Sequence, residues 1–262
     1  GDRDSWDTHI KDIEWSALTV DRRQCSGRRC RFVNQCPFFK ARTDLEESDC
    51  IVANHDLVMA DLALGGGAIL PPPEDCIYIC DEGHRLGDTA IRHFGAQCRI
   101  NRTLSWLERI PKQCKGQAPI FAKDTALAEQ LPRIEKEAAK ITELLSMAYP
   151  LLKEQMDKAD DYEGIYRFSH GDVGTAIRDI ATQITQHTSG WLGRLEVLED
   201  SLNEALSDKQ YPVATPDIEL FYQQAGTWLS GAERLLALWD LLHKELQQGN
   251  MPMACWLTLE DT

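Results

Sequence analysis

The sequence predicts a mainly α-helical protein in which a long helical segment follows a smaller α/β segment with a cysteine-rich loop. Three observations support this fold class. Apolar residues recur at three- and four-residue steps after residue 97, two short apolar runs precede them, and three cysteines lie within residues 25–36. A chain of 262 residues can form one large or two modest domains. We expect two, covering residues 1–96 and 97–262.

The second domain is expected to be a bundle of three long helices. Thr215 is the predicted N-cap of the third helix, Pro216 lies in its first turn, and Gly249 and Pro252 follow its end. The apolar run at 253–259 predicts a strand. The three stripes are expected to be core positions rather than a binding groove. They comprise Leu127, Leu131, Ile134, Ala138, Ile141 and Leu145; Ile177, Ile180, Ile184, Trp191, Leu195, Leu198, Leu202 and Leu206; and Ile218, Phe221, Ala225, Trp228, Ala232, Leu235, Trp239, Leu242 and Leu246.

The first domain is expected to contain two strands, at residues 50–53 and 76–80. Both runs are apolar without alternation, as are strands buried on both faces of a parallel sheet. The thiols of these runs, at Cys50, Cys76 and Cys80, are therefore predicted to be core residues. The connection between the runs contains Gly-Gly-Gly and Pro-Pro-Pro, which predict an exposed loop.

Charge is distributed unevenly along the chain. The formal net charge is −14, which argues against a surface devoted to nucleic acid. The segment 22–42 is positively charged, in contrast to the chain as a whole, because its seven charged residues are all basic. Phenylalanines lie among these basic residues. Proteins that bind single-stranded nucleic acid use arginines to contact the phosphates and aromatic rings to stack on the bases. The alternative is a solvated basic loop whose phenylalanines pack inward. The candidate nucleic-acid-binding residues are Arg22, Arg23, Arg28, Arg29, Phe32, Lys40 and Arg42.

Three closely spaced cysteines indicate a metal site. Cys25, Cys30 and Cys36 are separated by four and five residues, and thiolates on one short loop can share an iron–sulfur cluster or a zinc ion. A fourth ligand is lacking; Cys50 is a possible one, although a core position suits it better. Three unrelated thiols are the alternative. The total of nine cysteines favours a reducing compartment over a disulfide scaffold.

An acidic motif, Asp81-Glu82-Gly83-His84, directly follows the second apolar run. Carboxylates at the carboxyl end of a parallel strand lie where α/β sheets bind ligands. An aspartate there can hold Mg²⁺, and a neighbouring glutamate can deprotonate the water that attacks a γ-phosphate. The alternative is an acidic cap on the helix that follows.

Two stretches of the sequence resemble the bacterial DinG helicases, which are relatives of XPD in helicase superfamily two. They are CSGRRCRFVNQCPFFKARTDLEESDCIVANHDLVMADLA at 25–63 and ICDEGHRL at 79–86. The resemblance implies that Cys25, Cys30 and Cys36 are three ligands of a [4Fe–4S] cluster. It also implies that Asp81 is the Mg²⁺-associated carboxylate, that Glu82 is the catalytic base, and that His84 couples ATP hydrolysis to DNA movement.

By this resemblance, residues 1–96 are part of motor domain one and residues 97–262 form a helical arch domain. The expected function is that of a fragment of an ATP-dependent 5′–3′ DNA helicase. Such an enzyme acts on single-stranded DNA and DNA junctions in repair or replication, in the bacterial cytoplasm at the nucleoid. No apolar run approaches the roughly 20 residues that cross a membrane.

One departure from the family pattern bears on activity. The sequence contains no GxxxxGK[ST] phosphate-binding loop, so the isolated chain is expected to be inactive. This loop, the fourth cluster cysteine and the second motor domain are expected in the rest of a parent chain. Two alternatives remain at this point. One is a metal-stabilised single-strand-binding module without ATPase activity, and the other is a helical interaction domain with a zinc-bound arm.

Overall fold

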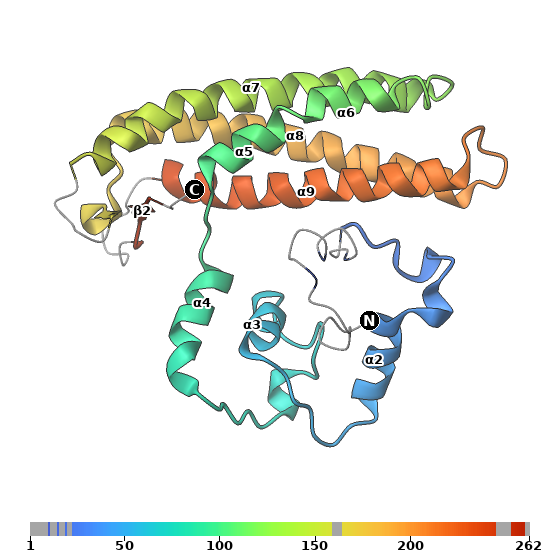
Figure 1. Ribbon diagram of the computed structural model, residues 1–262, viewed down its shortest axis with the longest axis horizontal. Coiled ribbons are helices and arrows are strands. Elements are labelled where there is room, and N and C mark those ends of the chain that lie inside the picture. Colours follow the sequence, from blue (N-terminus) through green and yellow to red (C-terminus); the bar gives the residue numbers. More distant parts are fainter. Residues whose placement is uncertain are drawn as a thin grey trace. The chain divides into compact units, whose positions relative to one another are not determined.

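The computed structural model describes residues 23–158, 164–244 and 253–259, together with residues 10, 15 and 19. Most of these residues are helical, as the sequence predicts (Figure 1). The chain divides into two compact units, Gly1–Ala96 and Gln97–Thr262. Among the described residues, no helix combines the length and the apolar character that a membrane span requires.

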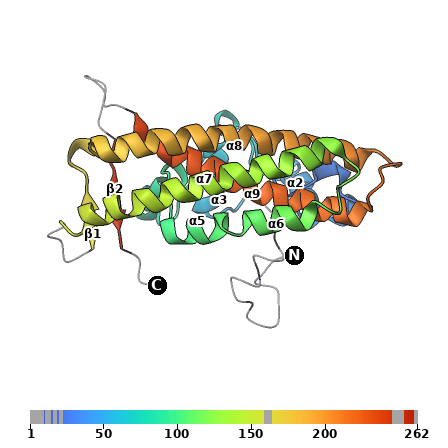
Figure 2. The same ribbon diagram turned by 90° about the horizontal axis from the view of Figure 1, so that it is seen from above.

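The second unit is built on three long helices, α7 (Thr125–Met156), α8 (Thr175–Ser207) and α9 (Thr215–His243). Figures 1 and 2 show them running along a common direction, and α8 packs against both α7 and α9. Two shorter helices, α5 (Ile100–Leu107) and α6 (Ile110–Gln117), pack against α7. The result is a helical bundle with one continuous apolar core.

The periodic apolar stripes form this core, which confirms the sequence prediction. Every described stripe residue is buried except Leu206 and Leu242, which are partly buried, and Leu246 lies outside the described residues. One boundary was wrong by a residue: Thr215 is the first helical residue of α9, and Ala214 occupies the N-cap. Pro216 lies in the first turn as expected, whereas the predicted end signals Gly249 and Pro252 fall outside the described residues.

Two short strands, β1 (Ile165–Arg167) and β2 (Trp256–Thr258), form an antiparallel pair beside α7. The second confirms the strand predicted at 253–259. Tyr166 and Leu257 are Cα partners in the pair and pack against the helical core. Because side chains alternate along a strand, the residues on either side of them project away from the core.

The first unit contains three helices among its described residues, α2 (Pro37–Glu46), α3 (His55–Ala63) and α4 (Leu86–Phe94). Helices α3 and α4 pack together, and Asp56 Oδ1 lies 3.1 Å from His93 Nε2 across their contact. Asn54 caps α3, because its side-chain oxygen accepts the Leu57 N–H at 2.8 Å.

The two predicted strands of this unit were wrong. Neither 50–53 nor 76–80 forms a strand, and the described part of the unit contains none. The side chains of Val52, Ile77 and Ile79 are 93–96% exposed. Cys50 and Cys80 are exposed and Cys76 is half-buried, so these thiols are not core residues. An extended run becomes a buried strand only where neighbouring strands satisfy its backbone N–H and C=O groups, and the described residues provide no such neighbours.

The connection between the two runs is held by Asp61, which is fully buried. Its carboxylate accepts the N–H groups of Ile69 at 2.6 Å, Gly67 at 3.0 Å and Leu70 at 3.3 Å. Burial opposes ionisation of this carboxyl, but the backbone N–H donors outweigh it and lower its pKa below the usual value. The predicted loop is therefore real, and one buried carboxylate organises it.

Candidate functional site

The acidic motif forms a tight, solvent-exposed turn between the extended run and α4. Glu82 has φ 48° and ψ 40°, a left-handed conformation that is uncommon for a residue other than glycine. Asp81 Oδ1 accepts the Glu82 N–H at 3.0 Å. A short 3₁₀ turn, η5 (Gly83–Arg85), then leads directly into α4. Strained backbone of this kind often occurs at functional sites, where surrounding interactions maintain it.

The turn brings the three predicted catalytic residues together. Glu82 Oε2 lies 3.4 Å from His84 Nδ1, and the side chains of His84 and Glu82 are 71% and 59% exposed. Asp81 is also exposed. The set contains a carboxylate that can associate with Mg²⁺, a second carboxylate that can accept a proton, and an imidazole beside it. All three side chains face solvent and are therefore accessible to a ligand.

The three clustered cysteines lie at the ends of short turns. Cys25 Sγ accepts the Gly27 N–H at 3.4 Å, and Cys30 follows the 3₁₀ turn η2 (Gly27–Arg29). Cys36 follows a second such turn, η3 (Val33–Gln35), and is the N-cap of α2. All three are half-buried, and all nine cysteines of the chain are free.

This arrangement does not fit a metal cluster as it stands. Thiolates are the ligands that iron–sulfur clusters take, so the chemistry of the donors is suitable. Among the described residues, however, no group of three or more cysteine, histidine or acidic side chains lies close enough to hold a metal ion. The three cysteines lie on one loop because they are close in sequence, but the loop as described does not bring three ligands within reach of one metal ion.

The basic segment presents arginines and aromatic rings to solvent. Arg28 and Arg29 are exposed in η2, Arg23 is half-buried, and Arg22 lies outside the described residues. The Phe32 ring is 56% exposed, and the guanidinium of Arg31 lies 4.8 Å from its centroid. The inward-packing alternative is therefore wrong for this ring.

Helix α2 continues the same surface. Phe38 is 53% exposed, and its ring makes an edge contact with Phe39 at 5.6 Å between centroids. Lys40 is exposed, whereas the Arg42 guanidinium donates to the Ala68 carbonyl at 2.7 Å and ties α2 to the Asp61 loop. Cys36, Phe39 and Lys40 also line a shallow hollow of about 370 Å³. Cations and aromatic faces thus lie together on this segment.

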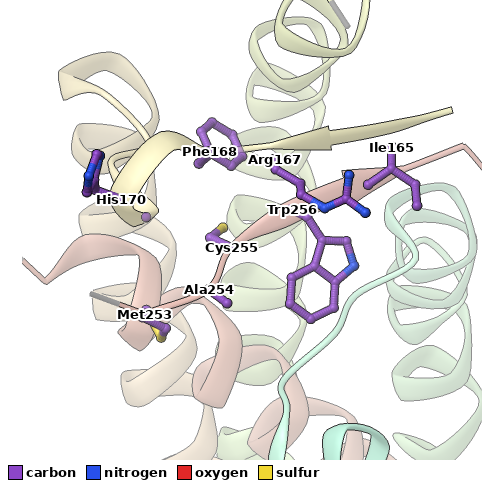
Figure 3. Close-up of a pocket in the computed structure, with 9 residues that line it drawn as sticks. Ile165, Arg167, Phe168, His170, Met253, Ala254, Cys255 and Trp256 are labelled. Atoms are coloured by element: carbon purple, nitrogen blue, oxygen red, sulfur yellow. The ribbon is translucent and has the colours of Figure 1, made fainter. Parts of the chain in front are cut away.

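A second hollow, of about 540 Å³, was missed by sequence reasoning. It lies on the β1–β2 pair of the helical unit and is lined by Arg167, His170 and Trp256, among others (Figure 3). Its lining comes from two segments about 90 residues apart in the sequence. Its lining residues belong to no sequence motif, and the apolar run 253–259, which contains Trp256, predicted only a strand.

Comparison with known proteins identifies relatives along almost the whole chain. No protein-family model matches it. The chain is 32% identical over 98% of its length to the ATP-dependent DNA helicase DinG of Photobacterium profundum. It is 28% identical over 99% to the protein of that name from Salmonella typhimurium, and 27% identical over 100% to that from Escherichia coli. The chain spans 36% of the length of each of these relatives. It is therefore homologous to a section of the DinG proteins.

Proposed function

We propose that this chain is part of an ATP-dependent DNA helicase that moves 5′ to 3′ on single-stranded DNA and acts at DNA junctions in repair or replication. The observation that carries the proposal is the turn at Asp81, Glu82 and His84. It places two carboxylates and an imidazole together in an accessible position, within a chain whose relatives are named DNA helicases. The setting we propose is the bacterial cytoplasm, at the nucleoid.

Each residue of the turn has a proposed role in ATP hydrolysis. Asp81 associates with Mg²⁺, Glu82 accepts the proton of the attacking water, and His84 transmits hydrolysis to DNA movement. The 3.4 Å distance between His84 Nδ1 and Glu82 Oε2 supports the last role, because a change in the charge of the carboxylate alters its electrostatic interaction with the imidazole. We assign residues 1–96 to motor domain one and residues 97–262 to a helical arch domain.

The basic segment is the proposed path of single-stranded DNA through the first unit. Arg28 and Arg29 offer exposed guanidinium groups for phosphates, and Phe32 offers a ring face for a base. Arg23, Lys40 and Arg22 extend the positive charge, although Arg22 lies outside the described residues. Arg42 contributes by holding α2 on the Asp61 loop.

We also propose that Cys25, Cys30 and Cys36 are ligands of a [4Fe–4S] cluster in the full-length protein. The support is their spacing and their position on one short loop. Among the described residues these cysteines do not form a group that could hold a metal ion, so the proposal requires the loop to rearrange.

The alternative of a single-strand-binding module without ATPase activity gains no support from the comparisons. Relatives 27–32% identical over nearly the whole chain carry the name of a helicase.

The test is the Glu82→Gln substitution in the full-length protein that contains this chain. Glutamine keeps the size of the side chain but cannot accept a proton, so unwinding and ATP hydrolysis should fall at least about 100-fold while nucleotide binding persists. Glu74→Gln, at another exposed carboxylate of the same unit, is the matched control and should unwind DNA normally. Unchanged ATP hydrolysis in Glu82→Gln would rule out its role as the base.

A further inference from the structure

The two short helices of the helical unit carry positive charge that the proposed ATPase and single-strand path do not use. Residues 97–123, which contain α5 and α6, include six basic residues and one acidic residue. Residues 124–262 include eleven basic residues and twenty-four acidic ones. The positive charge is therefore concentrated in one short segment of an otherwise acidic unit, and such an asymmetry is typical of a site for a polyanion.

Packing against the bundle determines which side of α6 faces solvent. Ile110 is fully buried, and Gln113 Oε1 accepts the Trp228 Nε1–H at 3.1 Å. Gln117 Nε2 donates to Gln224 Oε1, also at 3.1 Å. These three residues of α6 follow one another at steps of three and four, so they form the inner side of the helix and the opposite side faces outward.

The outward side of α6 carries the cations. Arg109 and Lys112 are exposed and three residues apart, and Lys115 follows at the next step of three with its side chain 73% exposed. The backbone at the junction of α5 and α6 is right-handed helical, so the two helices follow one another directly, as Figures 1 and 2 show. Arg102 of α5 is exposed as well. We define the basic face as Arg102, Arg109, Lys112 and Lys115.

Few carboxylates offset this charge. Glu135 of α7 lies 3.3 Å from Lys115, and Glu108 is the one acidic residue of the segment 97–123. The next positions of α7 on the side of Glu135 are uncharged, namely Ala139, Thr142 and Ser146. Helix α6 meets α9 through neutral side chains. The parts of α7 and α9 that contact α6 all lie within the described residues, and there the cations of the basic face outnumber the carboxylates beside them.

The two helices offer contacts to phosphates but not to bases. The aromatic residues of 97–123 are Trp106 and Phe121. Trp106 is half-buried with its ring against Gly231, and Phe121 is fully buried. The segment therefore provides no exposed ring on which an unpaired base could stack, unlike the basic segment with its exposed phenylalanines. Duplex DNA needs no such ring, because its bases are paired and it presents one negative charge per about 1.7 Å of its axis.

We propose that the basic face of α5 and α6 binds the phosphate backbone of duplex DNA. The class of ligand rests on the proposed function, because a helicase that acts at DNA junctions meets a duplex as well as a single strand. The proposed function also favours DNA over an acidic protein as the polyanion. The first unit thus holds the single strand through arginines and exposed rings, and the helical unit holds the duplex through cations alone.

The test is the binding of a fluorescent duplex of about 20 base pairs to the full-length protein that contains this chain, measured by anisotropy over a series of salt concentrations. Arg109→Glu with Lys112→Glu should raise Kd about tenfold or more and reduce the slope of log K against log salt by about 1.8, which corresponds to two phosphate contacts. The matched control is Arg133→Glu with Lys136→Glu on α7, an exposed pair with the same spacing and the same change of charge. It should change neither value, and an equal effect of the two pairs would overturn the proposal.

A chemical footprint on the unsubstituted protein gives a local measurement that does not depend on how the variants fold. Duplex DNA should protect Lys112 and Lys115 from acetylation by an N-hydroxysuccinimide ester, measured by peptide mass spectrometry, and should leave Lys136 reactive. Equal acetylation of Lys112 with and without the duplex would exclude the basic face as a duplex site. Protection by polyglutamate but not by the duplex would assign the face to an acidic protein and would also overturn the proposal.

Binding of an oligothymidylate separates this inference from the proposed function. Arg28→Glu should weaken it, whereas Arg109→Glu with Lys112→Glu should leave it unchanged. If the Arg109 and Lys112 variant weakens oligothymidylate and duplex equally, the face is a single-strand site and the duplex assignment is wrong. If that variant loses duplex binding alone while Glu82→Gln hydrolyses ATP normally, the basic face is supported and the proposed catalytic base is refuted.

Discussion

Gly231, in the middle of α9, is the position where one methyl group should have the clearest effect on stability. Gly231 is buried, and the ring of Trp106 from α5 packs directly on it. A Cβ added at Gly231 would lie 2.5 Å from Trp106 Cζ2, far inside van der Waals contact. The Trp106 ring also makes an edge contact with Trp191, with 5.7 Å between ring centroids, and this contact restricts its movement.

Two effects of Gly231→Ala oppose each other, and their magnitudes decide the sign. Helix propensity favours alanine over glycine by about 0.8–1.0 kcal/mol in a helix interior. Overpacking a close-packed core costs about 1–3 kcal/mol, and the rigid pair of indole rings places this site at the upper end of that range. We expect a net loss of about 1–2 kcal/mol in the free energy of unfolding, or roughly 2–8 °C in Tm.

Urea and thermal unfolding, followed by circular dichroism at 222 nm, measure this loss. Gly193→Ala is the matched control, because Gly193 lies in the interior of α8 with nothing within 4 Å of an added Cβ. That substitution should stabilise the protein by about 0.5–1 kcal/mol through propensity alone. If Gly231→Ala is as stable as the unsubstituted chain or more so, Trp106 does not pack on α9 as described.

Three further outcomes are expected. Asp61→Asn should lower the stability of the first unit by about 1–3 kcal/mol at pH 7, because the N–H groups of Gly67, Ile69 and Leu70 lose a charged acceptor. Since the folded-state pKa of Asp61 is lowered, its contribution is complete above about pH 4 and is lost as the pH falls through the folded value. Urea titrations at pH 7 and pH 3 should therefore show a smaller acid loss in Asp61→Asn than in the original chain, and an equal loss would contradict this role. The isolated 262-residue chain should hydrolyse ATP no faster than buffer in a phosphate-release assay, since its sequence has no phosphate-binding loop, and DNA-stimulated turnover would refute this. Iron and sulfide analysis should give less than one cluster per isolated chain, whereas four irons and four sulfides stable in air would show that a local group completes the site.

Local chemistry explains which predictions succeeded. The helices of the second unit were predictable because each carries an apolar stripe at the period of the α-helix, and any fold that buries such a stripe makes the same residues its core. The proximity of Asp81, Glu82 and His84 could be anticipated for a similar reason, whereas their predicted place at the end of a buried strand was wrong. Residues within four positions of one another lie close in space whatever the rest of the chain does.

Contacts between distant segments could not be predicted from the sequence. An apolar run such as 76–80 has the composition of a buried strand, but burial depends on neighbours that composition does not specify, and Ile77 and Ile79 are exposed. The spacing of Cys25, Cys30 and Cys36 limits the distance between their sulfur atoms without setting their direction. The turn that brings Gly171 against the Met253 carbonyl likewise depends on where two distant segments meet.

The sequence by itself determined the helical class, the core stripes and the motifs that indicate a helicase, because each depends on residues near one another along the chain. Only the tertiary structure decided that Asp61 would be a buried anchor, that Gly231 would face a tryptophan ring, and that Trp256 would lie beside Arg167 on an outward face. The second and third of these outcomes join segments far apart in sequence, and the first depends on how residues 67–70 fold back onto Asp61. Their energies come from packing and hydrogen bonding that exist only once the chain has folded.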